Sequence, residues 1–163
     1  MSLFAVLLAI PLAPVIIGVD MYKMHVKHDD SSHIYSELVI PTRMKDKDLV
    51  DEAIKKYSQT LPESEKYLFT NKAIPLLDKS HSIAKMKFRF NKELGTFEVV
   101  ANNVTRSQAT KHVEKIFDIY TRLVQQKVCE RVKTKLKETE EMTLDNEEVL
   151  EDDTVVLTVG VNG

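Results

Sequence analysis

Three histidines near the N-terminus come closest, by residue type and spacing, to a site that could do chemistry. His25, His28 and His33 lie close together, with Asp29 and Asp30 between them. A His-x-x-His spacing can place two imidazoles on one face of a helix, and imidazole with carboxylate ligands suits zinc. Structural zinc sites usually also use cysteine, and a solvated linker explains the same residues. We therefore predict no cofactor and keep a metal-dependent enzyme as an alternative.

The rest of the sequence contains none of the common catalytic motifs. It has no glycine-rich phosphate loop, no nucleophile elbow and no zincin helix. The single cysteine, Cys129, follows Val128 in a predicted amphipathic helix, which favours a buried thiol over a nucleophile. His81 and His112 are isolated, and we expect each on the surface or at the edge of an element. The sequence therefore predicts a protein that is not an enzyme.

Charge is segregated in the C-terminal third. Residues 106–137 contain nine basic and three acidic side chains, whereas 138–153 contain nine acidic side chains and no lysine or arginine. A basic amphipathic helix can bind phosphates or anionic lipid, and the acidic segment can also neutralise it. No aromatic side chains form a stacking platform among the basic residues, so nucleic acid is disfavoured as a partner. The candidate partner-binding residues are Lys111, Lys115, Arg122 and Arg131.

The N-terminus is uncharged from Met1 to Val19. As a helix, this run would be about 28 Å long, close to the thickness of the bilayer core. Lys23 and Lys27 follow it, and positive charge favours the cytoplasmic or stromal side. The predicted segments are a transmembrane anchor at 1–20, a juxtamembrane linker at 21–31 and a domain at 32–163. The predicted location is a single-pass membrane protein; the alternative is a buried strand or helix of a core.

Hydrophobic periodicity and turn residues predict the elements of the domain. They are strands at 33–40, 83–90, 97–101, 142–150 and 154–161, a helix from Asp46 or Asp48 to Gln59, and a helix at 107–140. Gly95 is expected in a left-handed position of a hairpin loop between 83–90 and 97–101, and Thr105 with Gln108 has the form of a capping box. The fold class is α+β, a two-layer sandwich of a mainly antiparallel sheet with two helices, one long, preceded by the N-terminal apolar helix. The last helix is roughly 50 Å long, which is longer than a small sheet can cover. Either part of its apolar stripe meets another chain, including a second copy, or it breaks near Thr134.

Composition agrees with a folded domain. The 163 residues are 43% hydrophobic and 29% charged, with a formal net charge of −2. These values exclude general disorder and a polycation.

Several segments are similar to one small family. They are Ser32-His33-Ile34, Lys47-Asp48-Leu49, the pair 86–91 and 97–101, Ile116–Tyr120, and 151–159 with its acidic turn. Together they resemble the thirty-fifth hypothetical chloroplast reading frame, a family from chloroplasts and cyanobacteria, over about residues 32–161. The apolar extension, residues 60–80 and Asp153 in place of the usual glycine depart from its pattern. The resemblance implies an accessory protein with a partner, an AAA+ ATPase being the candidate.

The sequence thus favours a non-enzymatic, membrane-anchored accessory module. It would bind a partner protein through the long helix or the acidic C-terminal hairpin. One alternative is a soluble protein that binds nucleic acid or an anionic surface through the basic helix 106–137. The other is the metal-dependent enzyme using His25, His28 and His33.

Overall fold

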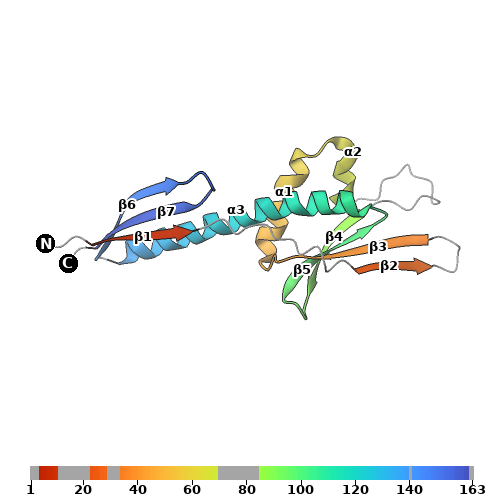
Figure 1. The fold of residues 1–163 in the computed structure, drawn as a ribbon, viewed down its shortest axis with the longest axis horizontal. Helices are drawn as coiled ribbons and strands as arrows, with labels where there is room; N and C mark the ends of the chain where they lie inside the picture. Colours follow the sequence, from red (N-terminus) through yellow and green to blue (C-terminus); the bar gives the residue numbers. More distant parts are fainter. Residues whose placement is uncertain (1–3, 11–22, 29–33, 70–84, 140, 162–163) are drawn as a thin grey trace. The chain divides into compact units, whose positions relative to one another are not determined.

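The protein is an α+β protein with antiparallel sheets and one long helix (Figure 1). The computed structural model describes residues 4–10, 23–28, 34–69, 85–139 and 141–161. The strands are β1 Phe4–Ile10, β2 Lys23–His28, β3 Ile34–Pro41, β4 Lys85–Asn91, β5 Thr96–Asn102, β6 Met142–Val149 and β7 Val155–Val161. The helices are α1 Lys47–Thr60, α2 Glu63–Lys66, the short 3-10 helix η2 Tyr67–Phe69 and α3 Arg106–Glu138.

The strands form two sheets, so the prediction of one sheet is wrong. Strands β1, β7 and β6 form one sheet in that order, and β2, β3, β5 and β4 form the other. The chain divides into two compact units: unit 1 comprises Met1–Pro14 and Thr121–Gly163, and unit 2 comprises Val15–Tyr120. Each unit therefore contains one sheet, and helix α3 runs from unit 2 into unit 1.

The core of unit 2 lies on one face of its sheet. Ile40 of β3 pairs with Val99 of β5, and both side chains are fully buried. Ala109 and Val113 of α3 belong to the same cluster of apolar residues. The first turn of α3 is fixed by the predicted capping box. The Gln108 N–H donates to the Thr105 hydroxyl, and the Thr105 N–H donates to the Gln108 side chain, both at 3.3 Å.

Helix α1 begins where the sequence predicts. The carboxylate of Asp46, its N-cap, accepts hydrogen bonds from the N–H groups of Asp48 and Leu49. The Tyr120 hydroxyl of α3 accepts from the N–H groups of Lys45 and Asp46, at 3.0 and 3.2 Å. These bonds satisfy backbone donors just before α1 and tie its start to α3.

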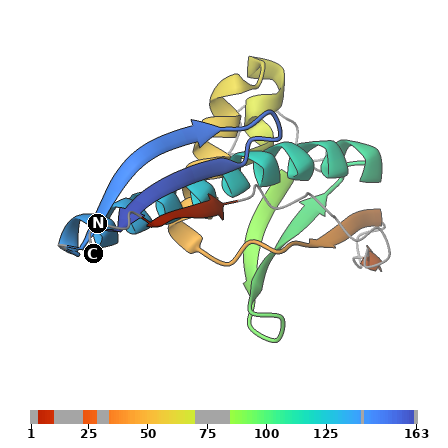
Figure 2. The ribbon, with the colours of Figure 1, turned by 60° about the vertical axis from the view of Figure 1, so that its left-hand side comes forward.

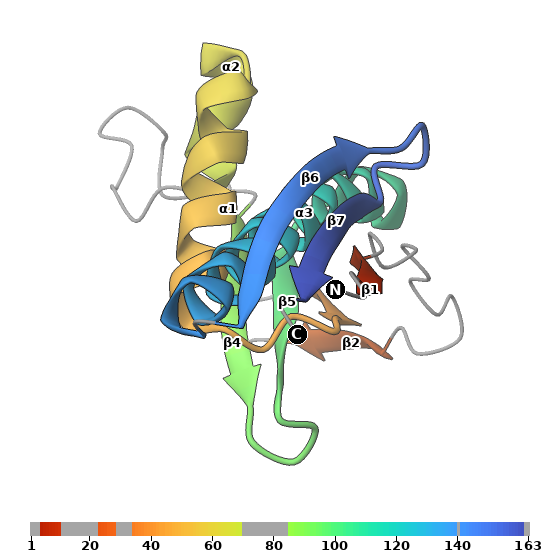
Figure 3. The same cartoon turned by 90° about the vertical axis from the view of Figure 1, so that its left-hand side faces the viewer.

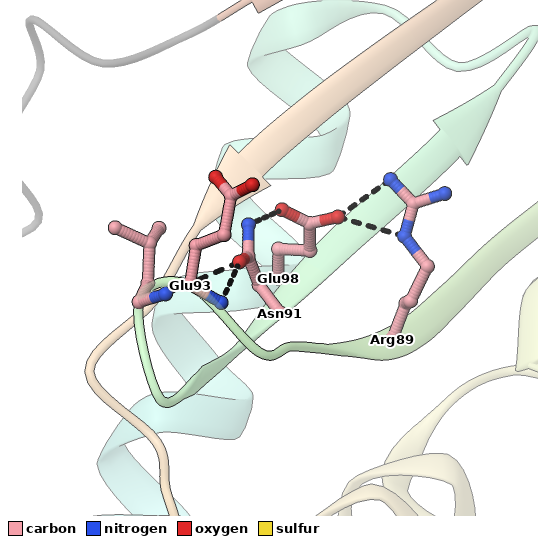
Figure 4. A network of polar contacts seen from close by, with 5 residues as sticks. Arg89, Asn91, Glu93 and Glu98 are labelled. Atoms are coloured by element: carbon pink, nitrogen blue, oxygen red, sulfur yellow. Dashed lines mark hydrogen bonds and ion pairs between the residues drawn. The ribbon is translucent and has the colours of Figure 1, made fainter.

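The hairpin β4–β5 is confirmed, with its loop projecting at the bottom of Figure 3. Gly95 has the predicted left-handed conformation, with φ +63°. Beside the loop, the carboxylate of Glu98, 7% exposed, accepts from Arg89 Nε at 2.7 Å and from Asn91 Nδ2 at 2.9 Å (Figure 4). The Asn91 side-chain oxygen in turn accepts from the N–H groups of Glu93 and Leu94. This network holds Arg89 against its own sheet.

The N-terminal segment corrects the membrane prediction. Phe4–Ile10 form strand β1, which pairs antiparallel with β7 from Phe4↔Val161 to Ile10↔Val155. No helix within the described ranges is long and apolar enough to cross a membrane, which contradicts the predicted single-pass location. The predicted anchor ran further than this strand, and residues 11–22 lie outside the described part of the chain. A short apolar run bounded by Pro11 suits a buried strand as well as a helix, and β7 provides its partner.

Unit 1 covers the second half of α3 with a sheet of the same chain. Leu157 is fully buried and clusters with Val155, Cys129 and Val132. The apolar stripe of α3 therefore needs no second chain there. The helix also continues through Thr134 without the break given as an alternative.

Candidate functional site

The acidic hairpin, residues 142–161 with strands β6 and β7, has an exposed edge. All eight residues of β6 are exposed to solvent. In the sheet, β7 lies between β1 and β6, so β6 pairs on one side only among the strands that the structure describes (Figure 2). An edge strand keeps a row of backbone N–H and C=O groups available for another chain.

The turn of the hairpin confirms the acidic turn predicted from the sequence. The Asp152 carboxylate accepts from the Thr154 N–H at 3.0 Å, and the Leu150 N–H donates to the Thr154 carbonyl at 2.8 Å. That bond from the Thr154 backbone lowers the pKa of Asp152, which keeps the exposed carboxylate charged. Asp153 adopts φ +62°, a conformation that aspartate tolerates better than most residues. An aspartate can therefore replace glycine in this turn.

A β-bulge interrupts β6 at Asp145. The register with β7 shifts between Leu144 and Asn146, which leaves Asp145 as the extra residue. The Asp145 carboxylate accepts from the Thr143 hydroxyl at 3.0 Å. A Cβ atom on Gly160 of β7 would lie 2.6 Å from Asp145 Oδ2, so the glycine makes room for this carboxylate. The bulge places an acidic group over the face of the sheet that is turned away from the Leu157 cluster.

A groove of about 530 Å³ lies between α3 and the acidic hairpin. Its lining includes Cys129 and Val155, both buried. Two ion pairs link α3 to the hairpin along the groove. Arg122 Nη2 lies 2.9 Å from Asp153 Oδ2, and Lys133 Nζ lies 2.6 Å from Glu147 Oε2. The hairpin thus partly neutralises the basic helix, a question that the sequence left open. Because both ion pairs are partly exposed, each contributes little to stability.

Cys129 is an apolar part of this groove. Its side chain is buried, as predicted, and burial raises the pKa of its thiol. The charge of Lys133 lowers the pKa of the thiol, but by less than burial raises it. The thiol is therefore neutral at pH 7 and packs as a small hydrophobic group.

The four candidate basic residues all lie on helix α3. Lys111 and Lys115 lie in unit 2, whereas Arg122 and Arg131 lie in unit 1. Arg122 is already paired with Asp153. The partner-binding role of these four residues stays a prediction.

The histidine cluster is only partly described. His25 and His28 lie in strand β2, opposite Glu37 and Ile34 of β3, and not in a helix. Positions three apart on a strand occupy opposite faces. His33 lies outside the described ranges, and no group of three His, Cys, Asp or Glu that could hold a metal occurs within them. The metal site stays a prediction.

A buried histidine is the polar feature that the sequence missed. His112 is 6% exposed, so the expected surface position is wrong. Its Nδ1 lies 2.8 Å from the Tyr57 hydroxyl, and the Phe69 ring lies edge-on to both rings. Burial lowers the pKa of His112, which nearby Lys111 also does, while Glu65 raises it. The neutral imidazole can accept from the tyrosine and is the form that the fold stabilises.

This pair predicts lower stability in acid. An unfolded chain takes up the His112 proton near pH 6.5, whereas the folded chain does so only at lower pH. The unfolded state therefore binds more protons in that window, and the free energy of unfolding should fall as pH decreases from about 6.5. Urea denaturation at pH 7 and pH 5 measures this. Tyr57→Phe should cost about 1 kcal/mol yet keep the pH dependence, whereas His112→Gln should flatten it; equal slopes in all three proteins would contradict the assignment.

Comparison with protein-family models, curated proteins and solved structures gives no match to this chain. The resemblance to the chloroplast reading-frame family therefore stays a prediction. Function is inferred from the acidic hairpin and the adjoining groove.

Proposed function

We propose that the protein is a non-enzymatic interaction module that binds a partner protein through strand β6. The observation that carries this proposal is the complete exposure of β6 at a sheet edge. An extended segment can add to such an edge through main-chain hydrogen bonds, while its alternate side chains supply specificity.

Charge selects the partner segment. Asp145 and Glu148 have no basic partner among the residues that the structure describes, whereas Glu147 is paired with Lys133. Residues 138–153 contain no lysine or arginine that could neutralise them. Complementary charge steers association and fixes specificity, so the partner segment is basic.

Apolar side chains along the same edge add contact area. Leu144 is 40% exposed and Val149 is 63% exposed. Both lie on the face of β6 that carries Glu147, opposite Val159 and Val155 of β7. A segment that alternates basic and apolar residues matches this arrangement.

A labelled peptide that alternates lysine and valine tests the proposal by fluorescence anisotropy. We expect the double substitution Asp145→Lys/Glu148→Lys to weaken binding about fivefold or more, because two pairs of roughly 0.5 kcal/mol each are lost. Asp51→Lys/Glu114→Lys changes the net charge equally on exposed positions of unit 2 and should bind like the wild type. The same peptide N-methylated at alternate amides should not bind, because it cannot complete a ladder. Equal weakening in both variants, or full binding of the methylated peptide, would overturn the proposal.

A further inference from the structure

A second edge strand of the chain carries the opposite charge. Strand β4 contains Lys85, Lys87 and Arg89 and no acidic residue. It pairs with β5 on one side and with no other strand in the described ranges. Among the described strands, both edge strands of the unit 2 sheet, β2 and β4, are basic, and one edge strand of the unit 1 sheet, β6, is acidic.

Strands β4 and β6 each carry two charged side chains that have no partner of opposite charge among the described residues. Arg89 is held by the buried Glu98 and belongs to its own sheet (Figure 4). Lys87 is exposed and Lys85 is half-buried, and neither has a carboxylate partner among the described residues. These two lysines correspond to the two unpaired carboxylates of β6, Asp145 and Glu148.

We propose that a second copy of this chain is the partner of β6, and that its strand β4 supplies the basic segment. This inference rests on the proposed function of β6. Pairing two copies of β6 would bring acidic groups together, and pairing two copies of β4 would bring lysines together, both of which are unfavourable. Pairing β4 with β6 places unlike charges side by side, through lysines of β4 that have no carboxylate partner among the described residues.

The distribution of side chains over the faces supports the same pairing. In β4 the lysines share one face, and Phe88 and Phe90 lie on the other, where Phe90 is 47% exposed. In β6 Glu148 lies on one face, and the exposed Val149 lies on the other. One alignment of β4 beside β6 therefore places the lysines of β4 next to the carboxylates of β6 on one face of the joined sheet. The same alignment places Phe90 next to Val149 on the other face.

The contact uses two different surfaces, so it is head-to-tail. Each copy that donates β4 still presents its own β6. Such heterologous contacts form rings when the rotation closes and open chains when it does not. The assembly should therefore grow with protein concentration and dissociate as salt rises, because its charges are exposed.

Charge reversal with rescue tests this inference on the full chain. Sedimentation velocity should show the wild type larger than a monomer, with a size that increases with concentration. Lys85→Glu/Lys87→Glu and Asp145→Lys/Glu148→Lys should each raise the dissociation constant about fivefold or more, from two lost ion pairs. Asp51→Lys/Glu114→Lys, the control, should assemble like the wild type.

Mixing the two reversed variants, or combining all four substitutions in one chain, restores opposite charge and should restore assembly. Reversed variants that associate like the wild type, or failure of the mixture to recover, would overturn the inference. A wild type that is monomeric at every concentration would overturn it too. If the lysine–valine peptide still binds β6 in that case, the proposed function stands and only the identity of the partner is wrong.

Discussion

Deletion of residues 1–10 is expected to unfold unit 1 or make the protein aggregate. Strand β1 pairs with β7 over seven residues, and deletion removes that ladder. Each backbone hydrogen bond contributes roughly 0.5–1.5 kcal/mol net, so the ladder contributes several kcal/mol. A domain is stable by only about 5–15 kcal/mol, which makes this a large fraction of the total. Deletion also exposes the edge of the apolar strand β7, which is a hazard for aggregation.

The outcome of this deletion distinguishes a role of residues 1–10 as a sheet strand from a role as a membrane anchor. Removing an anchor would leave the domain equally stable and more soluble, whereas removing β1 should lower the urea midpoint and increase light scattering. Point substitutions sharpen the test. Successive N–H groups of a strand point to opposite sides, so Leu7→Pro or Leu8→Pro must remove a ladder bond. Ser2→Pro, before β1, is the matched control, and a deletion variant as stable as the wild type would contradict the role of β1.

Elements with local signals were predicted well from the sequence. Asp46 caps α1 through bonds to residues two and three positions later. Gly95 provides the left-handed residue of the β4–β5 loop. Thr105 and Gln108 form the capping box at the start of α3. In each case the cause of the structure lies within a few residues, where spacing and residue type report it directly.

The pairing of the sheets could not be predicted in the same way. Phe4 pairs with Val161, at the other end of the chain, and hydrophobic alternation carries no information about such a distant partner. A short apolar run fits a helix or a strand, and length alone favoured the helix because the uncharged run continues to Val19. The choice between one sheet and two depends on the same distant pairings.

The candidate site likewise combines features that have a local sequence signal with features that depend on contacts between distant residues. The acidic charge and the hairpin itself are local features, and both were predicted. The groove and the pairs Arg122–Asp153 and Lys133–Glu147 depend on how α3 packs against the hairpin, which no spacing reveals. The burial of His112 likewise depends on α1, through Tyr57, which is 55 residues away. A histidine on an amphipathic helix has no sequence signal that distinguishes burial from exposure.

Leu157→Ala is expected to destabilise unit 1 by about 2–5 kcal/mol. Leu157 is fully buried in the cluster that joins β7 to Cys129 and Val132 of α3, so truncation leaves a cavity at the centre of that contact. Val149→Ala, at a largely exposed position of the same hairpin, should change stability by about 0.5 kcal/mol or less. Thermal unfolding followed by circular dichroism compares the two variants.

Hydrogen exchange in the Leu157→Ala variant should then divide helix α3 at the boundary of the two units. Residues 121–138 belong to unit 1 and should exchange faster, because their protection depends on the sheet that the substitution weakens. Residues 106–120 belong to unit 2, where Ala109 and Val113 pack in a separate core, and should keep their protection. Equal loss of protection along the whole of α3 would show that the units unfold together. If α3 frays only beyond Tyr120, each half of the helix depends on the core of its own unit. The helix propensity of residues 121–138 would then be insufficient to keep them helical without the sheet.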